Sequence, residues 1–99
     1  MSLTVVWSTQ ARDQFVATLN YIAKEDPHSA NLVIKRLDKS LRLLSESPDM
    51  GVPAPIVGVR TYAVPKTGHS FDYRTIRNEI RIQRWYRQKQ MPTTGQLSL

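Results

Sequence analysis

Arginine and aromatic side chains stand close together in the second half of the chain, and their chemistry is that of binding. Tyr73-Arg74 and the run IRIQRWYR at 80–87 place guanidinium groups beside aromatic rings. A guanidinium binds phosphate through paired hydrogen bonds and stacks on bases. Arginine, tryptophan and tyrosine are also enriched at the energetic centres of protein–protein interfaces. The pattern predicts a surface for an anionic partner, either a nucleic acid or an acidic protein.

The net charge of +6 is concentrated in the same half of the chain. Residues 1–50 carry six basic and six acidic side chains, which cancel. Residues 51–99 carry only two acidic side chains, Asp72 and Glu79, against eight basic ones, which are Arg60, Lys66, Arg74, Arg77, Arg81, Arg84, Arg87 and Lys89. Such asymmetry favours an anionic partner, although a basic face that only keeps the protein soluble remains an alternative.

Residue patterns typical of cofactor and metal sites do not occur in the sequence. It has no glycine-rich phosphate loop and no cysteine, and His28 and His69 are not spaced as metal ligands. We therefore expect no cofactor, no disulfide and no metal. His69, beside Gly68, could act as a general base, but the sequence shows no partner for it. Whether the chain is an enzyme stays open, and a nuclease would have to work without a metal.

A short strand and two helices are predicted for the first half. LTVVW at 3–7 is rich in β-branched and aromatic residues, as strands are. A serine or threonine at 8–9 can cap a helix whose apolar stripe ends near residue 25. Asp26 and Pro27 fit the cap and first turn of a second helix, which ends before Pro48. The short break between the helices predicts an antiparallel helix hairpin.

After Pro48 the apolar periodicity changes from helical to alternating. Alternation predicts strands at 60–64, 70–76 and 80–86, with a turn at 77–78. The stretch SPDMGVPAPIVGVR at 47–60 is a connector that proline stiffens and glycine allows to turn. The order β-α-α-β-β-β predicts an α+β fold, in which the helix hairpin packs on one face of a mostly antiparallel sheet.

Strict alternation also predicts which side chains of the last strand share a face. Tyr73 of the preceding strand, Ile80 and Ile82 are expected in the core beneath the helices, as are Trp7 and Phe15. The two faces of the last strand would then be Ile80, Ile82, Arg84 and Tyr86 on one side, and Arg81, Gln83, Trp85 and Arg87 on the other.

The length predicts a single domain over residues 1–99, with a loose tail at 91–99. The N-terminus lacks the basic and apolar regions of a signal peptide. No stretch approaches the roughly 18 apolar residues of a membrane span. Both observations predict a cytoplasmic protein.

The ordered set of motifs resembles the RelE/ParE superfamily of toxins from type II toxin–antitoxin systems. Residues 5–55 are similar to the first part of that family. They begin with VVWSTQARD, include the tyrosine-isoleucine pair that ends the first helix, and continue to the proline-glycine connector. VGVRTYAVP, with Arg60, resembles the connector arginine that leads into the sheet. SFDYRTIRNEIRIQRW resembles the tyrosine-arginine strand and the strand that follows it. The resemblance runs from about Thr4 to Lys89.

The resemblance implies a toxin that arrests growth, serves in plasmid stabilisation and is neutralised by a cognate antitoxin. ParE-like members inhibit DNA gyrase, whereas RelE-like members cut mRNA on the ribosome without a metal. Thr61, Ala63 and Ser70 replace the basic residues of the RelE-like nucleases, and Arg87 replaces their histidine near the end of the last strand. The connector reads Gly51-Val52-Pro53, where the family tends to have Gly-Arg-Pro.

These departures favour the ParE-like interpretation, with an mRNA endoribonuclease as the alternative. The antitoxin is expected on apolar surface of the helix hairpin and at an edge of the sheet, in a toxin–antitoxin hetero-oligomer. No catalytic residue is assigned. The candidate target-binding residues are Arg60, Arg74, Arg84, Tyr86, Arg87 and Lys89.

Overall fold

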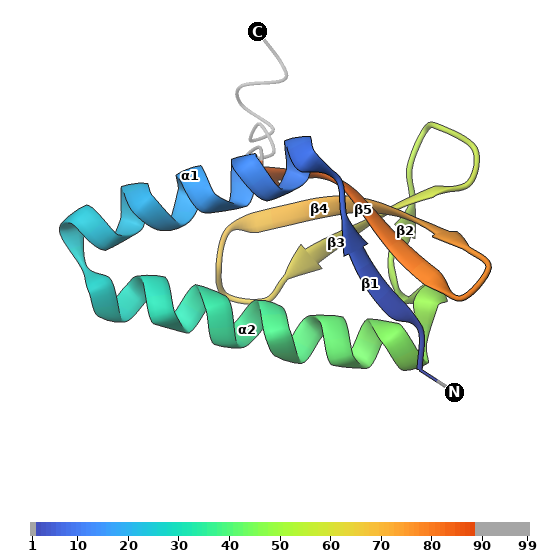
Figure 1. Ribbon diagram of the computed structural model, residues 1–99, viewed down its shortest axis with the longest axis horizontal. Coiled ribbons are helices and arrows are strands. Elements are labelled where there is room, and N and C mark those ends of the chain that lie inside the picture. Colours follow the sequence, from blue (N-terminus) through green and yellow to red (C-terminus); the bar gives the residue numbers. More distant parts are fainter. Residues whose placement is uncertain (1, 89–99) are drawn as a thin grey trace, which may run out of the picture.

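The computed structural model describes residues 2–88, and it confirms the predicted α+β fold (Figure 1). The tail at 91–99 and the candidate residue Lys89 lie outside the described residues. The elements are β1 (Thr4–Trp7), α1 (Thr9–Glu25), α2 (Pro27–Glu46), the 3₁₀-helix η1 (Pro48–Met50), β2 (Val52–Pro53), β3 (Val59–Val64), β4 (His69–Ile76) and β5 (Glu79–Arg87). No helix within residues 2–88 has the length and apolarity needed to cross a membrane.

Both helices begin at the predicted capping residues. The Ser8 side chain accepts a hydrogen bond from the Ala11 amide, 3.0 Å away. The Asp26 carboxylate accepts bonds from the amides of His28 and Ser29. These bonds satisfy backbone donors that a helix start leaves free. Because Asp26 both ends α1 and caps α2, the chain reverses direction in a single residue and the helices form the predicted hairpin.

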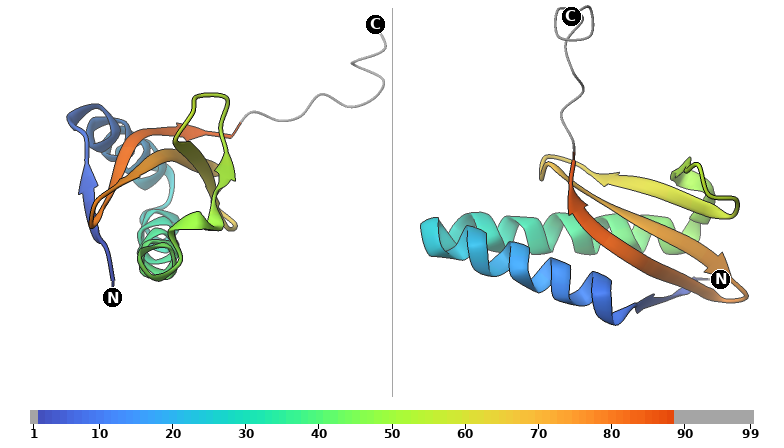
Figure 2. Two further views of the ribbon diagram at one scale, coloured as in Figure 1. Left: turned by 90° about the vertical axis from the view of Figure 1, so that its right-hand side faces the viewer. Right: turned by 90° about the horizontal axis from the view of Figure 1, so that it is seen from above.

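The five strands form one sheet in the order β1-β5-β4-β3-β2. Strand β1 runs parallel to β5, and the other three pairings are antiparallel. The two helices lie on one side of this twisted sheet (Figure 2). We call the opposite side of the sheet the outer face. The mostly antiparallel sheet is thus confirmed, while the two-residue strand β2 lies within the segment predicted as a connector.

The core lies between the helices and the sheet. Trp85, Tyr73 and Phe71 are its largest fully buried side chains. The ring of Phe15, from α1, meets Trp85 edge-on with 4.9 Å between ring centroids, and Trp7 lies 5.2 Å from Phe15. The prediction that Trp7 and Phe15 pack in or against the core is therefore confirmed.

A β-bulge in β5 contradicts the strict alternation predicted for residues 80–87. Tyr73 pairs with Ile82, but the preceding residue of β4, Asp72, pairs with Arg84 and not with Gln83. Gln83 is therefore an extra residue on β5. A bulge of this kind shifts the side-chain alternation of the strand beyond it.

The predicted faces of β5 are wrong beyond the bulge. Ile80, Ile82 and Trp85 are all buried and belong to one core cluster. Arg84 and Tyr86 instead lie on the outer face, where they contact other polar side chains. The alternation prediction had placed them with Ile80 and Ile82.

The cause of the bulge lies in α1 and its cap. The Ser8 hydroxyl donates to the Gln83 carbonyl oxygen at 3.1 Å. The Trp85 amide donates to the Gln14 side-chain oxygen at 2.9 Å. These two bonds satisfy backbone groups of β5 from residues more than 70 positions away in the sequence. The bulge is therefore fixed by tertiary contacts.

We expect the substitution Tyr73→Phe to lower the free energy of unfolding by about 1–3 kcal/mol. The Tyr73 hydroxyl donates to the Pro48 carbonyl and accepts from the buried Gly51 amide at 3.0 Å. The variant leaves both backbone groups without this partner. Urea unfolding followed by circular dichroism measures the loss. Tyr62→Phe is the matched control, because the Tyr62 hydroxyl makes no hydrogen bond to residues 2–88, and an equal loss there would contradict this account.

Candidate binding face

The structure divides the six candidate target-binding residues between the two sides of the sheet. Arg74, Arg84 and Tyr86 lie on the outer face. Arg60 pairs with the buried Tyr73, so its side chain points to the helix side. Arg87 also lies on the helix side, where it lines a pocket with residues of α1. The sixth candidate, Lys89, lies outside the described residues.

Asp72 organises the centre of the outer face. Its Oδ1 atom accepts hydrogen bonds from the Thr61 hydroxyl at 2.8 Å and from the Tyr86 hydroxyl at 2.7 Å. Its Oδ2 atom lies 3.4 Å from Nε of Arg84. The Arg84 guanidinium lies over the Tyr86 ring, 5.0 Å from the centroid. We call these four residues the Asp72 cluster. It holds one arginine and one aromatic ring in a fixed stacked arrangement.

Burial raises the pKa of Tyr86 above the usual value, and the hydrogen bond to Asp72 raises it further. The hydroxyl therefore keeps its proton at neutral pH. A protonated tyrosine that already donates to a carboxylate is not a general base. The Asp72 carboxylate is itself occupied by two hydroxyl donors and Arg84. The tyrosine of the cluster is therefore protonated, and its carboxylate is already bonded to neighbouring side chains.

Two further arginines lie next to the Asp72 cluster. Arg74 and Arg81 are paired across β4 and β5, and both extend the cationic part of the outer face. Arg81 forms an ion pair of 2.9 Å with Glu79. Arg74 reaches the tip of the β2–β3 loop, where its Nη1 lies 3.5 Å from the Val57 carbonyl oxygen.

Arg60 has a structural role at the connector. Its guanidinium donates to the carbonyl oxygens of Gly51, at 2.7 Å, and Asp49, at 3.3 Å. Its Nε also lies 3.8 Å from the Asp49 carboxylate. These bonds hold η1 and β2 against β3, and they separate Arg60 from the Asp72 cluster.

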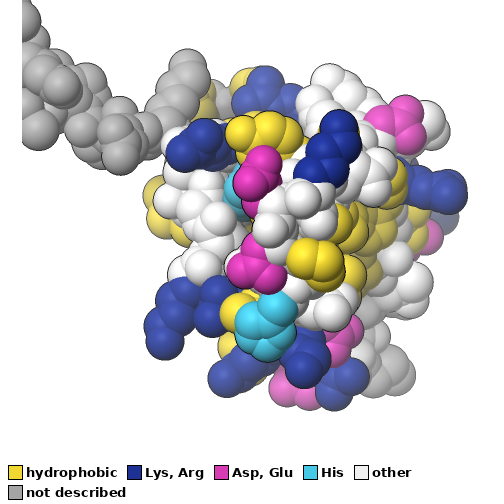
Figure 3. All heavy atoms as spheres, turned by 90° about the vertical axis from the view of Figure 1, so that its left-hand side faces the viewer, with side chains coloured by type: hydrophobic (Ala, Val, Ile, Leu, Met, Phe, Trp, Pro, Cys, Tyr) yellow, Lys and Arg dark blue, Asp and Glu magenta, His cyan; other side chains and the backbone are white. Residues whose placement is uncertain are grey.

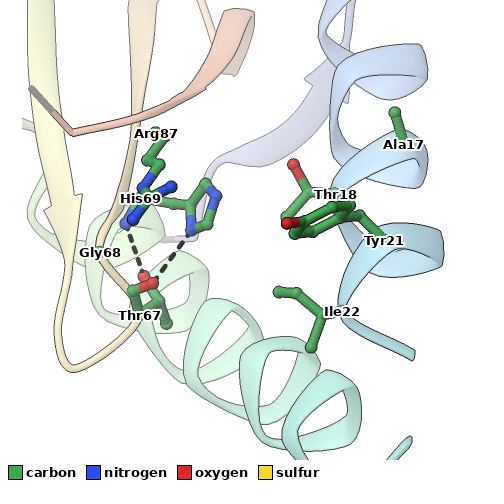
Figure 4. A pocket seen from close by; sticks show the side chains of 8 residues that line it. All are labelled: Ala17, Thr18, Tyr21, Ile22, Thr67, Gly68, His69 and Arg87. Atoms are coloured by element: carbon green, nitrogen blue, oxygen red, sulfur yellow. Dashed lines mark hydrogen bonds between the residues drawn. The ribbon is translucent and has the colours of Figure 1, made fainter. Parts of the chain in front are cut away.

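A pocket of about 580 Å³ lies on the helix side, between the second half of α1 and the β3–β4 turn (Figure 4). His69 and Arg87 line it from the sheet, and Thr18 and Tyr21 line it from α1. The His69 Nδ1 atom lies 3.0 Å from the Thr67 carbonyl oxygen. Since a carbonyl can only accept, Nδ1 carries a hydrogen in this contact and Nε2 is the ring's acceptor when the imidazole is neutral.

A second, apolar groove of about 600 Å³ runs between the two helices. Its lining residues are Trp7, Arg12, Phe15, Val16, Ile34, Leu37, Asp38 and Leu41. Where the two helices meet, acidic and basic side chains are interspersed (Figure 3). This helical side therefore offers apolar surface with mixed charge, unlike the arginine-rich outer face. Within the described part of the chain no three metal-ligating side chains lie together.

Sequence reasoning missed the partners that make the outer face a unit. From the sequence, Thr61 is only a departure from a family pattern, and Asp72 is only one of two acidic residues in a basic half of the chain. The structure instead pairs Asp72 with Arg84, while Arg74 contacts a loop. One signal was available in the sequence, because Asp72 is one of only two acidic residues after position 50.

We expect the fold to lose stability as the pH rises above about 10. Burial raises the pKa of both Tyr73 and Tyr86 from the ordinary value of 10.0. A group with a raised folded-state pKa stabilises the fold fully below its unfolded pKa, and this stabilisation is lost as the pH rises through the folded pKa. Urea unfolding between about pH 8 and 11 measures the slope. The double variant Tyr73→Phe/Tyr86→Phe should show a shallower decline, and an unchanged slope would contradict the assignment.

Comparisons with known proteins agree on family and fold. The model of the ParE toxin of the type II toxin–antitoxin system parDE matches residues 5–91. A comparison with curated protein sequences found no match. The chromosomal ParDE toxin–antitoxin system of P. aeruginosa contains a similar chain, with 22% identity, a TM-score of 0.74, and coverage of 89% of this chain and 98% of that one.

Two E. coli structures share the fold at lower identity. The isolated RelE toxin is 12% identical, with a TM-score of 0.67 and coverage of 98% of this chain and 96% of that one. A RelE double mutant in complex with a peptide of the antitoxin RelB is also 12% identical, with a TM-score of 0.64 and coverage of 100% and 96%.

Proposed function

Because this chain belongs to the ParE toxin family of type II toxin–antitoxin systems, we propose that it inhibits DNA gyrase and that a cognate antitoxin neutralises it. The observation that supports gyrase inhibition over RNA cleavage is the Asp72 cluster. A nuclease without a metal needs a base for the ribose 2′-hydroxyl as well as cations for the phosphate. The outer face supplies Arg74, Arg81 and Arg84 as cations, but Tyr86 keeps its proton.

An arginine-rich face with a stacked tyrosine suits a protein target with exposed carboxylates. Arginine and tyrosine carry much of the binding energy at protein interfaces when they are held in place before binding. Arg84 is held by Asp72 and by the Tyr86 ring, so little of its conformational freedom remains to be lost. Since gyrase is a cytoplasmic enzyme, the proposal places the chain in the cytoplasm.

The groove between α1 and α2 is the proposed antitoxin site. Its lining is mostly aliphatic and aromatic, and Val16 and Ile34 are each 44% exposed. Such a groove fits the apolar face of an amphipathic helix. The edge strands β1 and β2 leave backbone groups that an added strand could pair with. An antitoxin peptide is present in one RelE structure that shares this fold.

A supercoiling assay tests the proposed target. Purified chain, added in increasing amounts to gyrase, relaxed plasmid and ATP, is expected to reduce supercoiling and to increase cleaved DNA. Antitoxin added beforehand is expected to restore activity. Unchanged supercoiling and no cleaved DNA at a large excess of the chain would remove gyrase inhibition as its function.

A second candidate function is cleavage of mRNA on the ribosome, and the pocket on the helix side favours it. There His69 has Nε2 as an acceptor when its imidazole is neutral, and Arg87 lines the same pocket as a cation. These are the base and the cation that the outer face does not combine. Primer extension on translated mRNA is expected to show codon-phased cuts in that case, and His69→Ala is expected to abolish them. Absence of cuts with the wild-type chain would remove this candidate.

A further inference from the structure

The tip of the β2–β3 loop carries two of the three most exposed large aliphatic side chains among residues 2–88. Val57 is 91% exposed, Val52 69% and Ile56 66%. Ile56 and Val57 lie in the loop between β2 and β3, which projects beyond the sheet (Figure 1), whereas Val52 lies in β2 itself. Adjacent apolar side chains that are this exposed are typical of interaction sites.

The tip is an ordered turn. The Val59 amide donates to the Ile56 carbonyl at 3.1 Å, and the Ala54 amide donates to the Val59 carbonyl at 2.8 Å. Gly58 has a φ of +84°, which is the value that the third position of a type II turn requires. Proline at positions 53 and 55 restricts the approach to the turn. The apolar side chains are therefore held in place before any partner binds.

Arg74 joins this tip to the cationic outer face. Its Nη1 atom lies 3.5 Å from the Val57 carbonyl oxygen. A Cβ atom at Gly58 would lie 2.8 Å from the same Nη1, so the guanidinium sits directly against the turn. An apolar tip and a row of arginines thus form one continuous surface.

We propose that Ile56 and Val57 form an apolar anchor that inserts into a hydrophobic pocket on the protein target of this toxin, with carboxylates of that target facing Arg74 and Arg81. This inference rests on the proposed function, because it takes the outer face as the target-binding surface and adds the β2–β3 tip to that surface. We assign the partner as an acidic protein for two reasons. Two aliphatic side chains suit a small hydrophobic pocket on a protein surface. The arginines beside them attract carboxylates at the rim of that pocket. An ordered tip binds with little further loss of conformational entropy.

The double variant Ile56→Ser/Val57→Ser tests the anchor. We expect at least a tenfold loss of affinity for gyrase, measured by calorimetry, and loss of growth arrest when the variant is expressed without antitoxin. Stability should stay close to that of the wild-type chain, because both side chains are exposed. Leu43→Ser, at a 46% exposed position of α2, is the matched control and should retain affinity and growth arrest.

Several results would overturn the anchor. Full growth arrest by the double variant would do so, as would an equal loss in the Leu43→Ser control. The tip would instead be a lipid-binding site if the wild-type chain sediments with phosphatidylglycerol vesicles and the double variant does not, while the double variant still arrests growth. If wild-type chain leaves gyrase untouched but arrests growth, the proposed gyrase function fails, and dependence of that arrest on Ile56 and Val57 still supports the anchor. A wild-type chain without any toxicity would overturn both.

Discussion

Trp85→Ala is expected to lower the free energy of unfolding by about 3–5 kcal/mol, because it removes the largest side chain of the core. Trp85 is 1% exposed and is the largest fully buried side chain. Its ring meets Phe15 edge-on at 4.9 Å and stacks on His69 at 5.3 Å. Its Nε1 donates to the Thr18 hydroxyl at 3.0 Å. Alanine removes all of these contacts and leaves a cavity between α1 and the sheet.

The expected loss is large against the total stability of a small domain, which is about 5–15 kcal/mol. Each kcal/mol shifts the Tm of a domain of this size by roughly 4–8 °C. Urea and thermal unfolding, followed by circular dichroism, measure the effect. Trp85→Phe keeps a ring but not the Nε1 donor, so it should lose clearly less. Tyr21→Ala, at a 74% exposed position, should change stability by less than about 0.5 kcal/mol. Similar losses in all three variants would show that Trp85 is not central to the core.

The helical half could be predicted from the sequence because its signals are local. Asp26 followed by Pro27 marks the start of α2, and the structure begins α2 at Pro27. The apolar spacing along both helices also predicts which stripe is buried. A capping side chain and its helix are neighbours in the chain, so no distant contact is needed to set the boundary.

The faces of β5 could not be predicted, because their cause is distant. Gln83 is an extra residue only where the Ser8 hydroxyl and the Gln14 side chain satisfy the bulged backbone. No property of the residues around Gln83 indicates this. Alternation from Ile80 onward therefore placed Arg84 on the core side of the sheet, whereas the structure places it on the outer face.

The candidate binding residues share a residue type, arginine, lysine or tyrosine, but residue type does not indicate where the fold places a side chain. Arg60 and Arg74 look equivalent in sequence, yet Arg60 holds the connector through Gly51 and Asp49, and Arg74 lies under the β2–β3 tip. A guanidinium has five donors, so its role depends on which acceptors the fold brings to it. The roles of Arg84 and Tyr86 in target binding stay predictions.

Arg84→Ala is expected to weaken gyrase inhibition by about 30-fold or more, the size of a loss of 2 kcal/mol at the centre of an interface. The Arg84 side chain is 56% exposed, so it is available to a partner while Asp72 and the Tyr86 ring hold its orientation. Stability should fall by less than about 1 kcal/mol, because exposed ion pairs contribute little. Supercoiling inhibition against toxin concentration measures the first effect, and urea unfolding measures the second.

Arg42→Ala is the matched control for this prediction. Arg42 also pairs with an aspartate, with Nε 3.1 Å from the Asp38 carboxylate, but it lies on α2 and is 80% exposed. Equal losses in the two variants would show that inhibition follows net charge and not the Asp72 cluster. Arg84→Lys separates charge from geometry, because lysine keeps the charge but lacks the planar group that lies over the Tyr86 ring. The stacked arrangement distinguishes Arg84 from the other cations, so Arg84→Lys should inhibit gyrase more strongly than Arg84→Ala but less strongly than the wild-type chain. Full inhibition by the lysine variant would contradict a role for stacking.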